Sequence, residues 1–193
     1  MTDKKWFKNC IEDKKLVSKI EKIKLIVTDI DGALTDGYLY LTPDRTDPVS
    51  KKFSVQDGFA INEIIKNYFL KIAFLSGRND AVTKIRAKML GIPEDMCIIG
   101  STNKPEKIKI LQKDYKISKE ETLHFGDDFL DYQVKEAVNI FACPENAPFY
   151  IKCAADLIIP KNSNNNAFRL LLDLILYVQR KHFVQDLITE SLK

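Results

Sequence analysis

The sequence has little of what marks zinc-binding, secreted or membrane-spanning proteins. It contains four cysteines and two histidines, and no cysteines at the CxxC or CxH spacing of a zinc site or disulfide framework. Its longest apolar stretch, residues 170–178, is interrupted by Asp173 and is too short to span a bilayer. Residues 1–15 are polar and lack the apolar core of a secretory signal. We therefore expect a cytoplasmic protein with no membrane partner.

The sequence also lacks a strong excess of charge of either sign. Thirty basic residues stand against 27 acidic ones, and the lysines are interleaved with glutamates and aspartates. A net charge of +3 in this arrangement does not indicate a nucleic-acid-binding surface, although it could help attract an anionic metabolite. The 45% hydrophobic and 30% charged composition is that of an ordinary globular protein, and 193 residues suit a single domain.

Short apolar runs alternate along the chain with segments whose apolar residues recur at helical spacing. The runs cover residues 24–30, 71–76, 96–100, 122–127, 139–144 and 156–160. Near-continuous apolar runs of this length are typical of strands that are covered on both faces. The alternation predicts an α/β fold: a three-layer, doubly wound parallel sheet with right-handed crossovers, forming one domain over residues 1–193.

Three segments depart from this alternation. Residues 37–58 carry alternating aromatic and apolar positions on either side of a Pro/Asp-rich turn, which predicts a small β-hairpin flap projecting above the sheet. Residues 1–22 are predicted to add an amphipathic helix, and residues 167–190 a longer C-terminal helix. We expect both helical segments to serve packing rather than chemistry.

Polar clusters follow the predicted strands at the ends where a parallel sheet places its functional crevice. Asp29 and Asp31 follow the first strand, and residues 76–78 (SGR) follow the second. Lys104 comes after the third strand, and residues 127–131 (DDFLD) come after the fourth. The sequence therefore predicts that these groups meet at one edge of the sheet.

The residue types in this predicted cluster indicate phosphoryl transfer. A group of carboxylates requires a cation, and hard oxygen ligands suit Mg²⁺. We expect Asp29, Asp127 and the backbone carbonyl of Asp31 to bind the metal. Ser76 and Lys104 supply a hydroxyl group and a positive charge, which a phosphoryl group requires.

Two of the aspartates can carry the chemistry itself. A carboxylate can attack phosphorus directly and form an aspartyl-phosphate, which divides one displacement into two easier steps. We predict that Asp29 is this nucleophile. Asp31, two residues further on, is the predicted general acid/base, which protonates the leaving alcohol and then deprotonates the attacking water.

The order and spacing of these elements resemble the haloacid dehalogenase superfamily of aspartate-nucleophile phosphatases. The motifs that carry the resemblance are DxDGxLT, SGR, a lysine after the third strand, and GDDxxD. Within the superfamily, the stretches DIDGALTDG, KKFSVQDGFAI, GSTNK and GDDFLDYQV are similar to those of the 3-deoxy-D-manno-octulosonate 8-phosphate (KDO 8-phosphate) phosphatases. This resemblance extends over residues 24–160.

The resemblance implies an activity and an assembly. It implies a capless Rossmann-like domain with a flap, dependent on Mg²⁺ or alternatively on Mn²⁺ or Co²⁺. The reaction it implies is hydrolysis of KDO 8-phosphate to KDO and phosphate, on the route to lipopolysaccharide. It also implies a homotetramer in which neighbouring subunits help to enclose the active site.

The resemblance implies the roles given above for the catalytic and metal-binding aspartates and adds roles for their neighbours. Ser76, Gly77 and Lys104 are expected to bind the phosphate. Arg78 is expected to contact the substrate or its carboxylate. Asp128 is expected to act one step away from the metal, by orienting metal-bound waters or Lys104.

Three departures from the subfamily pattern leave the substrate open. Gln56 stands where an arginine is usual, residues 162–166 (NSNNN) replace a Gly-rich segment, and Asn79 and Asp80 follow SGR in place of the common Arg-x-Ser. A phosphatase of nine-carbon, sialic-acid-like sugar 9-phosphates is therefore an alternative. A phosphomutase and an ATPase-like enzyme are less favoured. A non-catalytic binding or assembly module linked to acylneuraminate cytidylyltransferase is the alternative from a different class.

Several residues near the motifs have simpler structural interpretations. Asp131 fits a carboxylate at a helix start as well as a functional role, and we leave it out of the predicted site. His124 is expected to be a satisfied core or near-site histidine rather than a metal ligand. Asp57 is expected to N-cap the helix after the flap. We expect His182 to lie at the surface and residues 51–52, both lysines, to be exposed.

Overall fold

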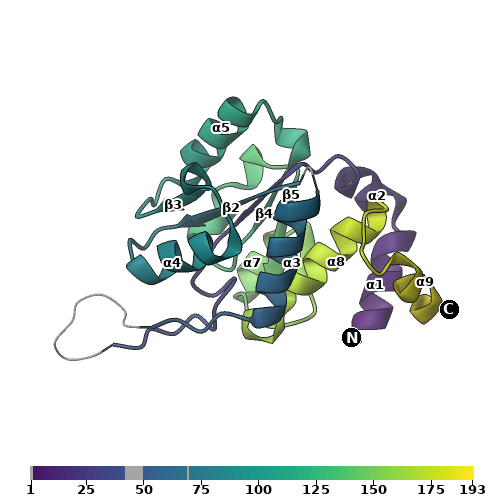
Figure 1. Cartoon of the computed structure of the whole chain (residues 1–193). Coiled ribbons are helices and arrows are strands. Elements are labelled where there is room, and N and C mark those ends of the chain that lie inside the picture. Colours follow the sequence, from purple (N-terminus) through teal and green to yellow (C-terminus); the bar gives the residue numbers. More distant parts are fainter. Residues whose placement is uncertain (1, 42–49, 69) are drawn as a thin grey trace.

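A parallel six-stranded sheet forms the centre of the computed structural model, which describes residues 2–41, 50–68 and 70–193 (Figure 1). The strands are β1 (Leu25–Thr28), β2 (Lys71–Ser76), β3 (Cys97–Ile99), β4 (Thr122–Phe125), β5 (Ile140–Pro144) and β6 (Leu157–Ile159). They lie in the order β3-β2-β1-β4-β5-β6, and every pairing is parallel. The predicted doubly wound parallel sheet is therefore confirmed, with each strand inside a predicted apolar run.

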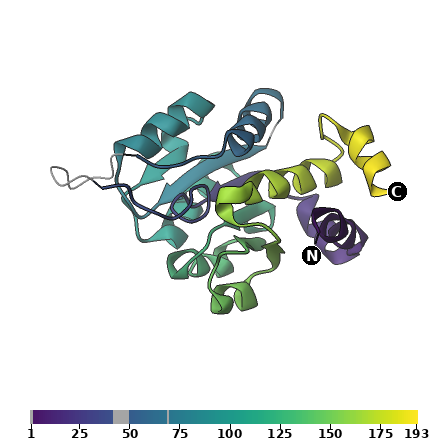
Figure 2. The same cartoon turned by 90° about the horizontal axis from the view of Figure 1, so that it is seen from below.

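Helices cover both faces of the sheet, which explains why the strands are apolar on both sides (Figure 2). One face carries α3 (Val55–Asn67), α4 (Ala81–Leu90) and α8 (Ala167–Val178), with α3 in contact with the other two. The other face carries α5 (Lys104–Tyr115), α6 (Phe129–Tyr132) and α7 (Phe149–Ala154). Short 3-10 turns lie at η1 (Glu94–Met96), η2 (Lys119–Glu121), η3 (Lys135–Ala137) and η4 (Ser163–Asn165). The central strand β1 is completely buried between these layers.

Both terminal helical segments are broken where the sequence predicted continuous helices. The N-terminal segment forms α1 (Asp3–Glu12) and α2 (Lys14–Ile20), because Asp13 leaves the helical conformation and caps α2. The C-terminal segment forms α8 and α9 (Gln185–Leu192), separated by a turn in which Arg180 has φ +55°. This turn brings His182 Nε2 to 2.9 Å from Asp173 Oδ1. His182 is therefore buried, and its predicted surface position was wrong.

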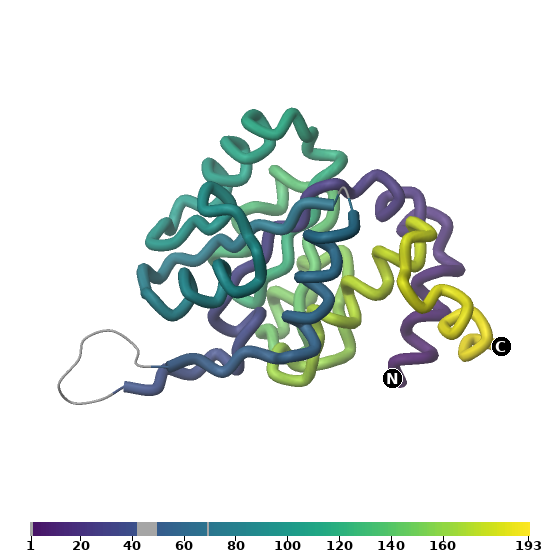
Figure 3. Tube along the Cα trace, viewed as in Figure 1, coloured from purple at the N-terminus to yellow at the C-terminus, as the bar shows by residue number. Residues whose placement is uncertain are grey.

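The N-terminal helices protect the edge of the sheet at β6, as their predicted packing role requires. The Trp6 indole Nε1 donates a hydrogen bond to the Ile158 carbonyl at 2.8 Å, and Asp3 pairs with Lys161 at 2.8 Å. α1 also contacts α8, and both chain termini lie on this side of the molecule (Figure 3). An edge strand otherwise presents unpaired backbone groups, and this extension satisfies one of them, the Ile158 carbonyl.

The described part of the predicted flap runs away from the body as two adjacent segments (Figures 1 and 3). Antiparallel bridges join Thr35 to Phe53 and Tyr40 to Ser50. Residues 42–49, where the prediction places the turn, lie outside the described residues. The flap ends earlier than predicted, because Ser54 accepts hydrogen bonds from the amides of residues 56 and 57 and begins α3.

Asp57 is therefore not the N-cap that the sequence suggested; it links two helices instead. Its side chain is buried, and Oδ1 accepts a hydrogen bond of 2.7 Å from the amide of Arg169 in the first turn of α8. Burial raises the pKa of Asp57 from 3.8 to about 7, although the Arg169 amide and guanidinium partly oppose the shift. The folded protein thus retains a proton that the unfolded chain releases at a much lower pH.

This shift makes the free energy of unfolding depend on pH. Because the pKa of Asp57 is raised in the folded state, its contribution to stability is lost as pH rises from about 4 to about 7. Asp57→Asn cannot ionise, yet its side-chain oxygen can still accept from the Arg169 amide. Relative to wild type, we expect the variant's free energy of unfolding to increase by about 3–4 kcal/mol as the pH is raised from 4 to 7.5. Urea unfolding at both pH values measures this gain; the exposed control Asp114→Asn should show none, and an unchanged pH dependence in Asp57→Asn would refute it.

Candidate active site

A cavity of about 470 Å³ lies at the carboxyl ends of β1, β2 and β4. Every residue predicted for the site lines it: Asp29, Asp31, Ser76, Gly77, Arg78, Lys104, Asp127 and Asp128. Thr102, Leu130 and Asp131 complete the lining. The parallel strands thus bring together residues that are up to 102 positions apart along the chain, from Asp29 to Asp131.

The most buried ion pairs of the cavity are made by Lys104. This residue begins α5 and is 2% exposed. Its Nζ lies 2.6 Å from Asp29 Oδ1 and 2.6 Å from Asp131 Oδ1. Burial alone would lower the pKa of Lys104, but the charges of the two carboxylates outweigh it and raise that pKa. Lys104 therefore remains a cation in the floor of the cavity.

Asp131 lines the cavity, although the site predicted from the sequence did not include it. Its Oδ1 accepts from Lys104 and lies 2.7 Å from His124 Nε2, while Oδ2 accepts from the amides of Asp127 and Asp128 at 3.1 and 3.3 Å. Burial would raise the pKa of Asp131, but the hydrogen bond from His124 and the charge of Lys104 hold it below its usual range. Asp131 thus orients both the lysine and the loop after β4.

This arrangement changes the interpretation of Asp128 and agrees with that of His124. The Asp128 side chain accepts from the amide of Phe129 at 2.7 Å and N-caps α6. One role predicted for Asp128 was to orient Lys104, but Asp131 makes that contact instead. The other predicted role, orienting metal-bound waters, stays a prediction. His124 is a buried near-site histidine, as expected, and burial lowers its pKa.

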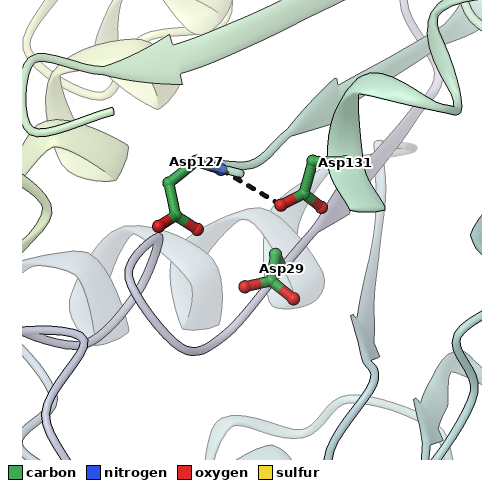
Figure 4. A group of neighbouring side chains, drawn as sticks. All are labelled: Asp29, Asp127 and Asp131. Atoms are coloured by element: carbon green, nitrogen blue, oxygen red, sulfur yellow. Dashed lines mark hydrogen bonds between the residues drawn. The ribbon is translucent and has the colours of Figure 1, made fainter. Parts of the chain in front are cut away.

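Three carboxylates face one another in the cavity. Oxygens of Asp29, Asp127 and Asp131 lie within 4.8 Å of one another (Figure 4). Asp131 already has four hydrogen-bonding neighbours, so Asp29 and Asp127 are the side chains with oxygens available for a metal ion. Burial raises the pKa of Asp127 to about 8, and the negative charge of Asp29 adds to the shift. Burial and the charge of Asp131 likewise raise the pKa of Asp29. This crowded pair of oxygen ligands fits a hard divalent cation.

The glycine and threonine of the DxDGxLT motif shape the loop that carries the first two aspartates. Gly32 has φ +95°, and a Cβ placed there would lie 2.1 Å from Asp127 Oδ2. Thr35 Oγ1 accepts from the Gly32 amide at 3.3 Å and donates to the Ile30 carbonyl at 3.2 Å. Asn146 Nδ2 donates to the Gly32 carbonyl at 3.2 Å. The motif therefore allows the β1 loop to approach the β4 loop closely enough for Asp29 and Asp127 to share a ligand.

Asp31 lies on the side of the cavity that faces the flap. Its carboxylate oxygens lie 2.8 Å from Lys51 Nζ and 3.5 Å from Arg78 Nε. Ser76 at the end of β2 is buried, and its Oγ accepts from the Arg78 amide at 3.1 Å. The expectation that Lys51 is exposed was wrong, because its side chain is fully buried. Lys52 is exposed, as expected.

Comparison with known proteins agrees with the motifs that form this cavity. The family of haloacid dehalogenase-like hydrolases matches residues 95–171. The 3-deoxy-D-manno-octulosonate 8-phosphate phosphatase KdsC of Haemophilus influenzae is 33% identical over 168 residues, which cover 87% of this chain and 91% of that protein. The chain belongs to the KdsC family of haloacid dehalogenase-like hydrolases. The resemblance seen in the sequence is thereby confirmed.

Solved structures of KdsC family members share the fold over nearly their whole length. The cobalt-bound H. influenzae phosphatase has a TM-score of 0.81 and 32% identity, covering 91% of this chain and 99% of that one. A Moraxella catarrhalis phosphatase in complex with magnesium, phosphate and KDO has a TM-score of 0.82 and 27% identity, covering 94% and 99%. Metals of the kind that Asp29 and Asp127 fit are therefore found in KdsC family structures.

The close approach at Gly32 predicts an effect of substitution on metal binding. Gly32→Ala should displace the Asp127 carboxylate, because the added Cβ would overlap it. We expect the dissociation constant for Mn²⁺, measured by electron paramagnetic resonance, to rise roughly 10–100-fold. Gly91→Ala is the matched control: Gly91 also has a positive φ, +80°, but an added Cβ would meet only Ile65, at 3.7 Å. Equal Mn²⁺ affinities in the two variants would contradict this account of the loop.

Proposed function

We propose that the protein is a Mg²⁺-dependent phosphomonoesterase that hydrolyses KDO 8-phosphate to KDO and phosphate through an aspartyl-phosphate on Asp29. The observation that carries the proposal is the placement of Asp29 between Lys104 and Asp127 at the floor of the cavity. Membership of the KdsC family supports the reaction, because the relatives named above are octulosonate 8-phosphate phosphatases.

In this proposal Asp29 attacks phosphorus and Asp31 transfers protons. Lys104 fixes one oxygen of Asp29 by its 2.6 Å hydrogen bond, which leaves the other oxygen available for attack. Asp31 reaches the cavity from the same loop and would protonate the leaving sugar oxygen, then deprotonate the attacking water. The aspartyl-phosphate thus forms as the ester P–O bond breaks, and water later releases the phosphate and regenerates Asp29.

The remaining residues bind the phosphate, the metal and the sugar acid. Asp29, Asp127 and the backbone carbonyl of Asp31 would hold Mg²⁺, or Mn²⁺ or Co²⁺ in its place. When bound, the ion supplies positive charge that offsets the repulsion between the carboxylate nucleophile and the phosphate dianion. The Lys104 ammonium would supply further positive charge to the phosphate, and hydrogen-bond donors at residues 76–77 would bind its oxygens. Arg78, whose side chain is 40% exposed at the cavity, is proposed to contact the carboxylate of the substrate.

We also propose that the protein is a single-domain, cytoplasmic homotetramer with no nucleic-acid or membrane partner. Within the part of the chain that the structure describes, no helix has the length and apolarity needed to cross a membrane. Apolar side chains are exposed on the flap, with Tyr38 70% and Leu41 60% accessible, and subunit packing would cover such a surface.

Phosphate release from a panel of sugar phosphates tests the proposed substrate. We expect hydrolysis of KDO 8-phosphate in the presence of Mg²⁺ and none after EDTA treatment. Preference for a nine-carbon sialic-acid-like sugar 9-phosphate would keep the mechanism but correct the substrate. An absence of metal-dependent hydrolysis of the sugar phosphates and of an aryl phosphate would instead identify a non-catalytic module.

Substitution of the nucleophile tests the mechanism separately from the substrate. Asp29→Asn should lower kcat by roughly 10³-fold or more, because an amide oxygen cannot form the aspartyl-phosphate. Asp114→Asn, an exposed substitution on α5, should leave kcat unchanged. Circular dichroism checks that both variants are folded. A folded Asp29→Asn protein with wild-type kcat would refute the assignment of Asp29.

A further inference from the structure

The flap places one charged side chain inside the protein. Lys51 lies on the returning segment of the flap, between the bridges at Ser50 and Phe53. Its side chain is fully buried, whereas its neighbour Lys52 is exposed. A buried ammonium group is costly unless charged and polar partners satisfy all of its donors, so its surroundings indicate what holds it there.

The partners of Lys51 come from two different elements. Its Nζ donates to Asp80 Oδ2 at 2.7 Å and to Thr83 Oγ1 at 3.1 Å, at the N-terminal end of α4. It also donates to Asp31 Oδ2 at 3.1 Å and lies 2.8 Å from Asp31 Oδ1. An ammonium has three hydrogen-bond donors, and these three residues accept all of them. Lys51 therefore bridges α4 and the loop after β1.

One end of this bridge is rigid. Asp80 is the N-cap of α4, and its Oδ1 accepts from the Thr83 amide at 2.8 Å. Asp80 is 3% exposed and Thr83 is completely buried. Because the helix fixes both of them, they also fix the position of the Lys51 ammonium.

The other end is a carboxylate that needs to be held. Asp31 lies at the cavity with its side chain 23% exposed, and its other charged neighbour, Arg78, is 3.5 Å away and itself 40% exposed. The two short contacts with Lys51 therefore restrict the rotation of the Asp31 carboxylate more than the longer contact with Arg78 does. They also attach the base of the flap to the cavity wall.

We propose that Lys51 is a positioning residue: its buried ammonium, anchored on Asp80 and Thr83, orients the Asp31 carboxylate for proton transfer to the leaving oxygen. The inference rests on the proposed function, in which Asp31 is the general acid/base. Lys51 itself does not contact the reacting atoms; it acts through Asp31. Because Lys51 belongs to the flap, Asp31 is correctly oriented only when the base of the flap is packed against α4.

This role predicts a dependence on the leaving group. An alkoxide leaves phosphorus slowly unless it is protonated, whereas 4-nitrophenolate needs little help from an acid. A misplaced Asp31 should therefore affect the ester of an alkyl alcohol far more than the aryl ester. Loss of a purely structural contact would lower activity on both substrates alike. The ratio of kcat/KM for the two substrates separates these possibilities, because kcat/KM reports the steps up to phosphate transfer.

The test uses Lys51→Met, which keeps most of the side-chain length and removes the charge, with Lys52→Met as the matched control. We expect Lys51→Met to lower kcat/KM for KDO 8-phosphate by roughly 10–100-fold and that for 4-nitrophenyl phosphate by less than about threefold. Lys52→Met should change neither value. If Lys51→Met folds poorly, Lys51→Met/Asp80→Asn removes the unpaired buried carboxylate and should give the same ratio.

The outcomes distinguish this inference from the proposed function. An equal loss on both substrates, or no loss on the sugar phosphate, would overturn the role of Lys51 and leave the proposed phosphatase intact. A wild-type protein that hydrolyses neither substrate would overturn the proposed function, and with it the role of Lys51.

Discussion

The ion pairs of Lys104 with Asp29 and Asp131 are the interaction on which the site depends. Burying Asp29, Asp127 and Asp131 so close together would be prohibitive without positive charge, and Lys104 supplies only part of it. The charge of Asp131 is balanced by its ion pair with Lys104, whereas the pKa values of Asp29 and Asp127 stay raised. The cavity therefore has a fixed cation on one side and unbalanced carboxylates on the other. A divalent metal ion would complete the charge balance, and a phosphate group would then fit between the two cations.

Much of this arrangement can be predicted from the sequence because it follows from the sheet. Near-continuous apolar runs identify the strands, and parallel strands place their carboxyl ends at one edge of the sheet. The proximity of Asp29, Ser76 and Lys104 can therefore be predicted from the sequence. Asp131 could not be assigned, because a carboxylate in the first turn of a helix has the same local pattern whether it caps the helix or pairs with a distant lysine. Lys51 was misjudged for a related reason: its partners are 20 to 32 residues away and nothing in the flap sequence points to them.

One departure from the subfamily pattern, residues 162–166, is hydrogen-bonded to elements that surround the cavity. In the segment of residues 162–166, the Ser163 amide donates at 2.7 Å to Asn146 Oδ1, and Asn146 in turn holds the Gly32 carbonyl. Asn166 accepts a hydrogen bond from Ser54, where the flap ends and α3 begins. The Asn-rich segment thus connects the end of the flap to the loop after β1 that carries Asp31 and Gly32. This segment therefore helps to hold the flap and the loop after β1, while the charged groups of the cavity come from other parts of the chain.

A crystal structure of the protein grown with Mg²⁺ and beryllium trifluoride, which imitates a phosphoryl group on a carboxylate, tests the central claim most directly. The account predicts beryllium bonded to a carboxylate oxygen of Asp29, with Mg²⁺ between Asp29 and Asp127 and Lys104 against the fluorides. Beryllium bonded to Asp127 or Asp131, or Mg²⁺ bound away from Asp29, would contradict the assignment of nucleophile and metal site.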